Sequence, residues 1–377
     1  MISLRKDSSP KGAPTAERLS EKLAELIPLR HYLVTGYARN GFFLLMKALQ
    51  WDSVAEIIIP AFTCPIIKHT ITAAGYVPVP VDAEEHGINI DPQKITASIT
   101  DRTKAIYVVH TYGMVADIET ICAIAKKHNL IVIEDLAHAP FSLYKGKPLG
   151  TYGDYAILSF TKKIINFEGG AVGTNNTTIY SRMAMLQREY MRQRSYSPRR
   201  LVDYFVRMIG SWWESRFSPV ALLLMKLNDA INTLVYKGSY GISIDDAGFL
   251  SHEISCRITL RQTDHLLKKY RENNADYLKN AGAAKGIRMY QARQNGHDTR
   301  PFYFTGIPTN RSKLYKLLSF RTWHNSNEPG AYPRADYLYG NYRIFSKAVL
   351  LFLPQTKRKD QIVLLQGQGG SYDQDVK

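Results

Sequence analysis

The sequence predicts an α/β protein with a mostly parallel central sheet, helices on both faces of that sheet and a smaller C-terminal α+β domain. Short apolar runs rich in Ile and Val, bounded by Gly and polar residues, are typical of strands buried on both faces. These runs alternate with segments of helical periodicity, which is the pattern of crossover connections between parallel strands. The length of 377 residues exceeds what a single hydrophobic core usually fills, which indicates a large and a small domain.

Each expected element follows from a local pattern in the sequence. The apolar runs predict strands at 55–61, 76–82, 104–109, 130–134, 155–160 and 170–174. Helical periodicity predicts helices within 37–51 and at 92–99, 116–128 and 250–278. The last of these helices is expected to lead into the small domain.

Changes in composition along the chain indicate the domain boundaries. Polar residues with Pro and Ser predict a flexible arm over 1–18, and a flexible tail is expected over 367–377. The large domain is expected over 19–250 and the small domain over 251–366. Within the large domain, about 176–236 is expected to be a basic helical insertion.

The overall composition, 45% hydrophobic and 22% charged, is ordinary for a soluble globular protein. Three widely separated cysteines, Cys64, Cys122 and Cys256, offer neither a disulfide framework nor the spacing of a metal site. The first residues contain no apolar core, so no signal peptide is expected. We therefore expect a protein of the reducing cytoplasm.

The formal net charge of +16 indicates an anionic partner. A phosphorylated small molecule and an acidic membrane surface both satisfy it. Nucleic acid is not expected as a partner, because the chain shows no helix-turn-helix signature, zinc-finger spacing or aromatic-studded RNA-binding motif.

The basic insertion has two readings. Trp212, Trp213 and many arginines recur there at roughly helical spacing. A basic amphipathic helix with Trp is suited to an anionic membrane, which would give peripheral contact through 188–226. The same residue types are common at interfaces, and helices packed between domains or subunits are the reading that fits better.

Two candidate catalytic residues each lie just past the end of a predicted strand. Asp135 follows the strand 130–134, and Lys162 follows the strand 155–160. Since the carboxyl ends of parallel strands share one edge, the fold brings a carboxylate and an amine to the same place. That pair suits pyridoxal 5'-phosphate (PLP), whose aldehyde a lysine holds as a Schiff base while a carboxylate pairs with the pyridinium nitrogen. Alone, either residue could also be a helix cap or a solvated charge.

The wider sequence resembles the DegT/StrS family of PLP-dependent, fold-type I sugar aminotransferases. The matching words are PAFTCP (60–65), PVPVD (78–82), INIDP (88–92), RTKAI (102–106), HTYGMVAD (110–117), AIAKKHNLIVIEDLAHA (123–139), YKGKPLGTYGD (144–154) and SFTKKIINFEGGAV (159–172). They stand in the family's order and spacing over about a third of the chain.

The resemblance implies roles for the residues of the last two words. Lys162 is implied as the Schiff-base lysine, because Glu168 follows it at the family's spacing, and Lys163 is the alternative. Asp135 is implied to keep the ring nitrogen protonated. His138 is implied to reach the phenolic oxygen or the face of the cofactor, and Ser159 its phosphate.

The resemblance also covers the positions that bind the phosphate and the ring of the cofactor, but some of them carry different residues in this sequence. Asn40, Gly41 and Phe42 occupy the turn whose helix amides hold the phosphate, and Phe42 replaces the usual hydroxyl residue. Cys64 stands where many relatives have an aromatic residue stacked on the ring. His110 and Tyr112 lie in a family word but suit structural roles as well. The loop that reaches a neighbouring subunit's phosphate has no match here, although a homodimer is still expected.

The function that the resemblance implies is transfer of an amino group, usually from glutamate, to a keto sugar attached to a nucleotide, for surface polysaccharide or glycan biosynthesis. A lipid-linked or other keto substrate is an alternative. A non-catalytic binding or regulatory protein on the same fold is a second one. Sugar dehydration on this scaffold usually has His in place of the Schiff-base lysine, and Lys162 or Lys163 argues against it.

Overall fold

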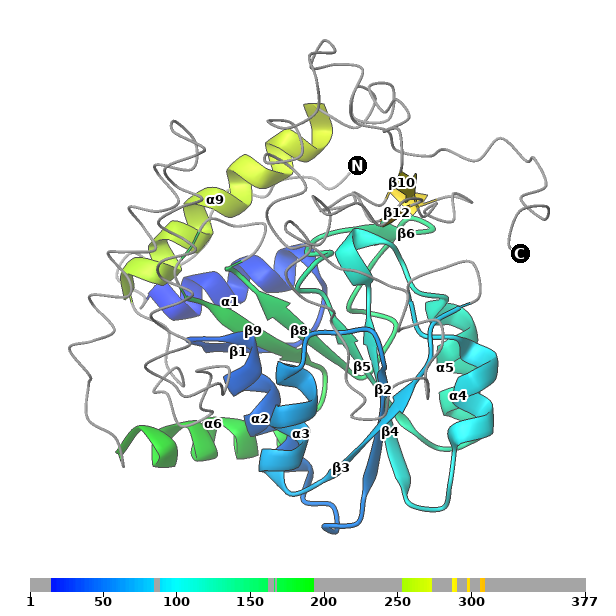
Figure 1. Cartoon of the computed structure of the whole chain (residues 1–377). Helices are drawn as coiled ribbons and strands as arrows, with labels where there is room; N and C mark the ends of the chain where they lie inside the picture. Colours follow the sequence, from blue (N-terminus) through cyan, green and yellow to red (C-terminus); the bar gives the residue numbers. More distant parts are fainter. Residues whose placement is uncertain are drawn as a thin grey trace, which may run out of the picture.

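The computed structural model describes residues 15–84, 89–161, 166, 168–192, 253–272, 287–289, 297–298 and 306–308. The strands of its main sheet are β1 (His31–Thr35), β2 (Glu56–Pro60), β3 (Val77–Val81), β4 (Thr103–Val109), β5 (Ile131–Asp135), β8 (Tyr155–Ser159) and β9 (Gly170–Thr174). Their order is β1-β9-β8-β5-β4-β2-β3 (Figure 1). From β8 to β3 all neighbours are parallel, whereas β9 is antiparallel to both β8 and β1. The prediction of a mostly parallel sheet is confirmed.

The six strands predicted from apolar runs all form, with ends within about one residue of the expected ones. β1 was not among the predicted strands. Its apolar run, Tyr32 to Val34, is short and follows Arg30 and His31, so it lacks the length that identified the other strands. β1 pairs only with β9 in the main sheet and forms one of its edges.

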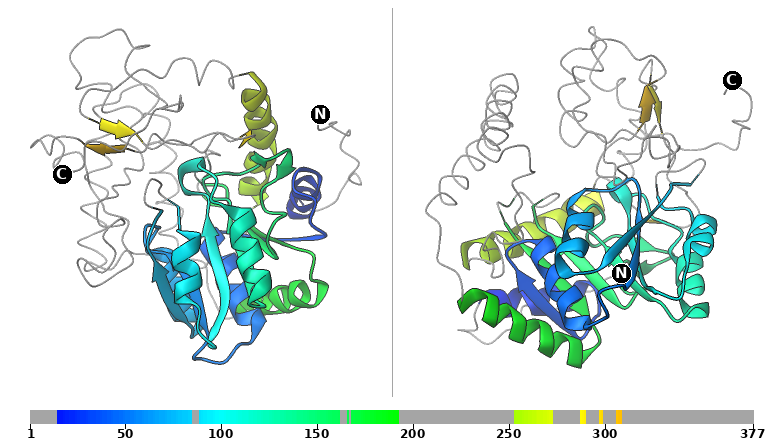
Figure 2. Two further views of the ribbon diagram at one scale, coloured as in Figure 1. Left: turned by 90° about the vertical axis from the view of Figure 1, so that its right-hand side faces the viewer. Right: turned by 60° about the horizontal axis from the view of Figure 1, so that its bottom comes forward.

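Helices cover both faces of the sheet, as predicted. Buried residues of α1 (Thr15–Leu26), α4 (Pro92–Ser98), α5 (Ile118–Lys127) and α9 (Glu253–Glu272) belong to one apolar cluster. Those of α2 (Ala38–Leu49), α3 (Ile66–Ala74) and α6 (Thr177–Arg192) belong to a second cluster on the opposite face. The right-hand view of Figure 2 brings α6 forward on the side that carries α2 and α3, and the left-hand view shows α4 and α5.

Two helices lie near the boundaries that composition indicated. α1 begins at Thr15, so the helix includes the last residues of the expected arm, and the Thr15 hydroxyl donates to the Glu253 carboxylate of α9. α9 agrees with the long helix predicted at 250–278 and lies along α1 (Figure 1).

α6 packs Ile179 and Met183 into the second cluster, so residues 177–192 belong to the helical layer of the large domain. The remainder of the expected insertion, including Trp212 and Trp213, lies outside the described residues.

The C-terminal part is described only in pieces. β10 (Ile287–Met289) pairs with β12 (Gly306–Pro308), and β11 (His297–Asp298) pairs with β6 (Leu143–Tyr144), which also pairs with β7 (Lys147–Pro148). The rest of the expected small domain and the tail at 367–377 lie outside the described residues. Among the helices that the structure describes, none has both the length and the apolar character of a transmembrane span.

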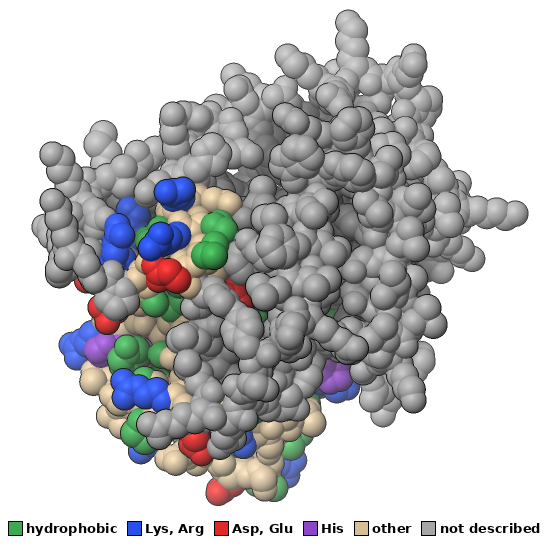
Figure 3. All heavy atoms as spheres, turned by 90° about the vertical axis from the view of Figure 1, so that its left-hand side faces the viewer, with side chains coloured by type: hydrophobic (Ala, Val, Ile, Leu, Met, Phe, Trp, Pro, Cys, Tyr) green, Lys and Arg blue, Asp and Glu red, His purple; other side chains and the backbone are tan. Residues whose placement is uncertain are grey.

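Charges of both signs mix on the described surface. On the face shown in Figure 3, the coloured Lys and Arg side chains are interspersed with Asp and Glu side chains. An ion pair at the base of the sheet joins the buried Glu56, at the start of β2, to the largely exposed Arg102. The Glu56 carboxylate accepts from Arg102 Nε at 2.9 Å and from the Thr100 hydroxyl at 2.5 Å. The Thr100 hydrogen bond and then Arg102 lower the pKa of Glu56, against the effect of burial.

We expect Glu56→Gln to lower the free energy of unfolding at neutral pH, measured by urea denaturation, by roughly 1–2 kcal/mol. Because the folded-state pKa of Glu56 is lowered, its contribution is complete above the unfolded value of about 4.3 and is lost as the pH falls through the folded value. The gap between the variant and the wild type should therefore close on acidification below about pH 4. Glu119→Gln, which breaks an exposed pair with Lys145, is the control and should shift the midpoint little. A gap that does not change with pH would contradict the assignment.

Candidate active site

Asp135 lies at the carboxyl edge of the sheet, at the end of β5. It is level with Val109 of β4 and Ile157 of β8, so three parallel strands deliver their ends to this edge. Its side chain is 7% exposed. Oδ2 accepts the hydroxyl of Tyr107 at 2.9 Å, and Oδ1 accepts the backbone N–H of Ala137 at 2.8 Å. The carboxylate is therefore held in one orientation by two donors.

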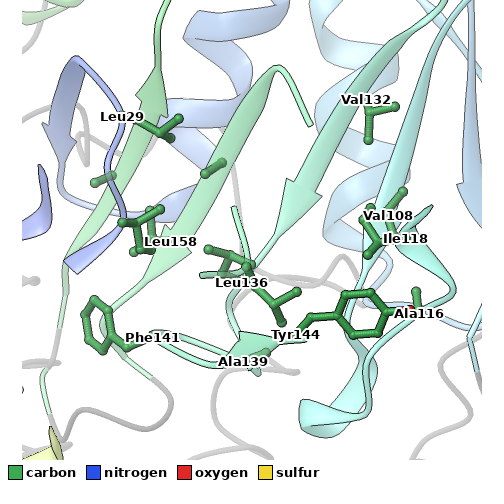
Figure 4. Close-up of a cluster of buried hydrophobic side chains, with 14 of the residues drawn as sticks. Leu29, Val108, Ala116, Ile118, Val132, Leu136, Ala139, Phe141, Tyr144 and Leu158 are labelled. Carbon is green, nitrogen blue, oxygen red and sulfur yellow. The ribbon is translucent and has the colours of Figure 1, made fainter. Parts of the chain in front are cut away.

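The connection after β5 is anchored by apolar side chains. Leu136 and Ala139 are fully buried, and Phe141 packs into the same cluster (Figure 4). The backbone N–H of Leu136 also donates to the carbonyl of Ile157 at 2.8 Å. His138 lies within this anchored connection and is 3% exposed. Asp135 and His138 therefore lie on the same anchored stretch of backbone.

The start of α2 lies at the same edge, because β1 runs parallel to β5 and β8 and ends just before the helix. The carbonyl of Tyr37 accepts the N–H groups of Asn40 at 3.1 Å and Gly41 at 3.2 Å. The positive end of the helix dipole thus faces the edge, although the amides of these two candidates already bond within the first turn. Gly41 also has a packing role, since a Cβ there would lie 2.7 Å from Val172 Cγ2.

Phe42, the third candidate in this turn, is 2% exposed and lies in the interior. Its ring contacts the ring of Tyr107, with 4.7 Å between centroids and 49° between planes. The side chain therefore packs behind Asp135. Cys64 lies in the turn after β2, is half-buried and is a free thiol.

The two glycines that follow Glu168 are required by the backbone around them. Gly169 has a φ of 128°, and its N–H donates to the carbonyl of Gly36. A Cβ on Gly170 would lie 2.3 Å from the backbone nitrogen of Ala38, at the start of α2. The glycines thus let β9 begin directly against the N-terminus of α2.

Ser159, the last residue of β8, is 6% exposed, and its hydroxyl lies 3.2 Å from that of Thr161. Lys162 and Lys163 follow at once, and both lie outside the described residues. Because β8 and β5 are adjacent and parallel, the segment with the two lysines starts at the edge where Asp135 ends.

The chain on the far side of the lysines is fixed to α9. Asn166 Nδ2 donates to the carbonyl of Ser255 at 2.9 Å, to its hydroxyl at 3.0 Å and to the hydroxyl of Thr259 at 2.9 Å. The Ser255 hydroxyl in turn donates to the carbonyl of Glu168 at 2.9 Å. Ser255 and Thr259 are fully buried on one side of α9. We call these four residues the Asn166 clamp.

His110 has a structural role in this structure. Its Nδ1 accepts the N–H of Ala116 at 3.2 Å, so Nε2 carries the proton and lies 3.4 Å from Glu134. Both side chains are fully buried. The Glu134 carboxylate also accepts the backbone N–H groups of Gly150 at 2.8 Å, Tyr152 at 2.8 Å and Gly153 at 2.6 Å. The side chain of Tyr112 lies outside the described part.

Tyr107 is the site residue that the sequence analysis missed. It stands in the apolar run AIYVV of β4, which was taken only as a buried strand. A signal was present, because a buried tyrosine hydroxyl usually has a hydrogen-bond partner. Among groups of His, Cys, Asp and Glu in the described ranges, none has the arrangement of a metal site.

We expect Asn166→Ala to increase the rate of amide hydrogen exchange in peptides covering 159–169 by roughly tenfold or more, because it removes both N–H donors that Nδ2 shares among three acceptors of α9. Thr259→Val should give a smaller increase, since it removes one acceptor. Thr263→Val is the matched control: this buried hydroxyl bonds only within α9, to the carbonyl of Thr259 at 2.7 Å. Equal exchange in all three variants would show that the clamp does not fix the segment.

Comparison with known proteins agrees with this geometry. The model of the DegT/DnrJ/EryC1/StrS aminotransferase family matches residues 3–210, which is more than half of the chain. A GDP-perosamine synthase of Caulobacter vibrioides is 35% identical over 170 residues, covering 45% of this chain and 46% of the relative. A dTDP-3-amino-3,6-dideoxy-alpha-D-galactopyranose transaminase of Aneurinibacillus thermoaerophilus is 42% identical over 178 residues, covering 46% and 49%.

The chain thus spans about half the length of these curated relatives. Among solved structures, the aminotransferase TlmJ of Streptoalloteichus hindustanus has a TM-score of 0.62 at 19% identity, over 86% of this chain and 83% of that one, which supports the fold. The chain belongs to the DegT/DnrJ/EryC1/StrS aminotransferase family.

Proposed function

We propose that this protein is a PLP-dependent aminotransferase that transfers an amino group from glutamate to a keto sugar linked to a nucleotide. The observation that carries the proposal is the oriented, buried carboxylate of Asp135 at an edge that also holds the start of α2 and the end of β8. A carboxylate, a helix N-terminus and a serine hydroxyl are the donor and acceptor set that PLP requires at its ring nitrogen and phosphate.

The residues of this chain have the following roles in the proposal. Asp135 pairs with the ring nitrogen and keeps it protonated. The Ser159 hydroxyl binds the phosphate together with the backbone at the start of α2, the turn that contains Asn40, Gly41 and Phe42, while the Phe42 side chain stays in the interior. His138 reaches the phenolic oxygen or the face of the cofactor, and Cys64 lies against the ring.

When bound, PLP supplies the aldehyde that accepts the amino group and the ring that takes up electrons. Lys162, with Lys163 as the alternative, holds the cofactor and moves the proton that leaves the α-carbon of the amino donor. The hydrogen bonds from Tyr107 and from the Ala137 N–H keep the Asp135 carboxyl group in place while that proton moves.

The names of the relatives support the substrate class. Both curated relatives carry the names of enzymes that make nucleotide-linked amino sugars, and the net charge of +16 suits a diphosphate. We infer that the product serves surface polysaccharide or glycan biosynthesis. We also propose a cytoplasmic homodimer with peripheral membrane contact through 188–226. A lipid-linked or other keto substrate is the alternative within the same chemistry.

We expect purified protein loaded with PLP to show the visible absorption of lysine-bound cofactor. Lys162→Ala should abolish that band, whereas Lys163→Ala should keep it, because only one of two neighbouring side chains can reach the aldehyde. Absorption spectra of the three proteins decide the matter. Loss of the band in Lys163→Ala alone would move the attachment by one residue.

We expect glutamate to convert the bound PLP to its amine form, and a keto-sugar nucleotide to reverse the conversion. Absorption spectroscopy follows both steps, and mass spectrometry identifies the amino sugar. Asp135→Asn should slow the conversion by at least roughly a hundredfold, because the ring nitrogen loses its anionic partner. Reversal only by a lipid-linked keto sugar would change the carrier, and no conversion with any amino acid would favour a binding or regulatory protein.

A further inference from the structure

Tyr107 and Asp135 form a hydrogen bond in the interior, behind the edge where the proposed site lies. Tyr107 is opposite Ile133 in the parallel pairing of β4 and β5, and Asp135 is two residues further on. Since side chains two residues apart share one face of a strand, the two residues are diagonal neighbours. The long phenol therefore reaches along the sheet to Asp135 Oδ2, at 2.9 Å.

The hydroxyl has a fixed place and keeps its proton. Tyr107 is 2% exposed, and the ring of Phe42 packs against it. Burial, and then the negative charge of Asp135, raise the pKa of Tyr107 well above its ordinary value. The phenol therefore keeps its proton at neutral pH and donates it in the hydrogen bond to the Asp135 carboxyl group.

The carboxylate of Asp135 accepts hydrogen bonds at both oxygens, from the Tyr107 hydroxyl at Oδ2 and from the Ala137 N–H at Oδ1. Hydrogen bonds to the charged form of a carboxyl group stabilise that form, which offsets the cost of burying it. When such a carboxylate shares a proton with a basic ring nitrogen, the proton therefore resides mainly on the nitrogen.

We propose that Tyr107 is a positioning residue that keeps Asp135 ionised and oriented, so that the ring nitrogen of the cofactor carries the proton. This inference rests on the proposed function, because it acts through the pairing of Asp135 with PLP. It also gives a role to Phe42. Its side chain has no hydroxyl to offer a phosphate, and its ring instead supports the phenol.

The test uses the full-length protein loaded with PLP labelled with ¹⁵N in the ring, whose ¹⁵N chemical shift distinguishes a protonated nitrogen from a neutral one. In the wild type we expect the protonated shift. Tyr107→Phe removes one oxygen atom and keeps the ring. We expect it to reduce the equilibrium constant for protonation of the ring nitrogen by roughly ten- to a hundredfold, the effect of losing a hydrogen bond to a charged group. Asp135→Asn gives the neutral reference.

Tyr32→Phe is the matched control. Tyr32 is also buried, at 4% exposure, and its hydroxyl donates to the carbonyl of Ile27 at 2.7 Å, away from Asp135. This variant should keep the protonated shift and its pH profile. In the Asp135→Asn background, adding Tyr107→Phe should leave the shift unchanged, because the phenol acts only through the carboxylate.

Two results separate the inference from the proposed function. A folded Tyr107→Phe protein that binds the label and keeps the wild-type shift and pH profile would overturn the role of Tyr107 alone. Wild-type protein that binds no labelled PLP would overturn the proposed function, and the inference with it. A folding defect in Tyr107→Phe is recognised by circular dichroism. In that case Phe42→Leu, which removes the support of the phenol, should lower protonation in the same direction, and an unchanged shift would count against the inference.

Discussion

The edge of the sheet that bears the site depends on the buried carboxylate of Glu134. A buried charge is costly unless hydrogen bonds compensate it, and here three backbone N–H groups and the ring of His110 do so. These bonds tie β5 to the turn before β8 and to the turn after β4. The next residue, Asp135, therefore stands on a backbone that is held by two neighbouring turns.

Two neighbouring acids have different roles because a strand alternates its faces. Glu134 is enclosed by turns on the side of α5, whereas Asp135 points to the side of α2 and meets Tyr107. The first carboxylate has all its partners within the protein. The second has donors on both oxygens and lies at the carboxyl end of its strand, which is where sheets of this type bind ligands. The same residue type thus stabilises the edge at 134 and serves chemistry at 135.

Much of this arrangement could be predicted from the sequence, because it rests on local patterns. Apolar runs identified six strands, and Asp135 stood at the end of one of them. The bond from Tyr107 could not be predicted with the same ease, since it depends on the register between β4 and β5. The Asn166 clamp joins residues 89 positions apart in the chain, and no local pattern marks such a pair. The family motif around Asn40 and Gly41 correctly indicates the start of a helix. It does not indicate that the N–H groups of these two residues are already hydrogen-bonded within the first turn.

The Asn166 clamp connects the segment of the candidate lysines to a helix that continues toward the C-terminal part of the chain. At its start, α9 is hydrogen-bonded to Thr15 of α1 through Glu253. Further along α9, Ser255 and Thr259 accept hydrogen bonds from Asn166. A rotation or slide of α9 would have to break these hydrogen bonds or carry residue 166 along with it. The position of α9 and the position of residue 166, between the candidate lysines and β9, are thus tied to each other.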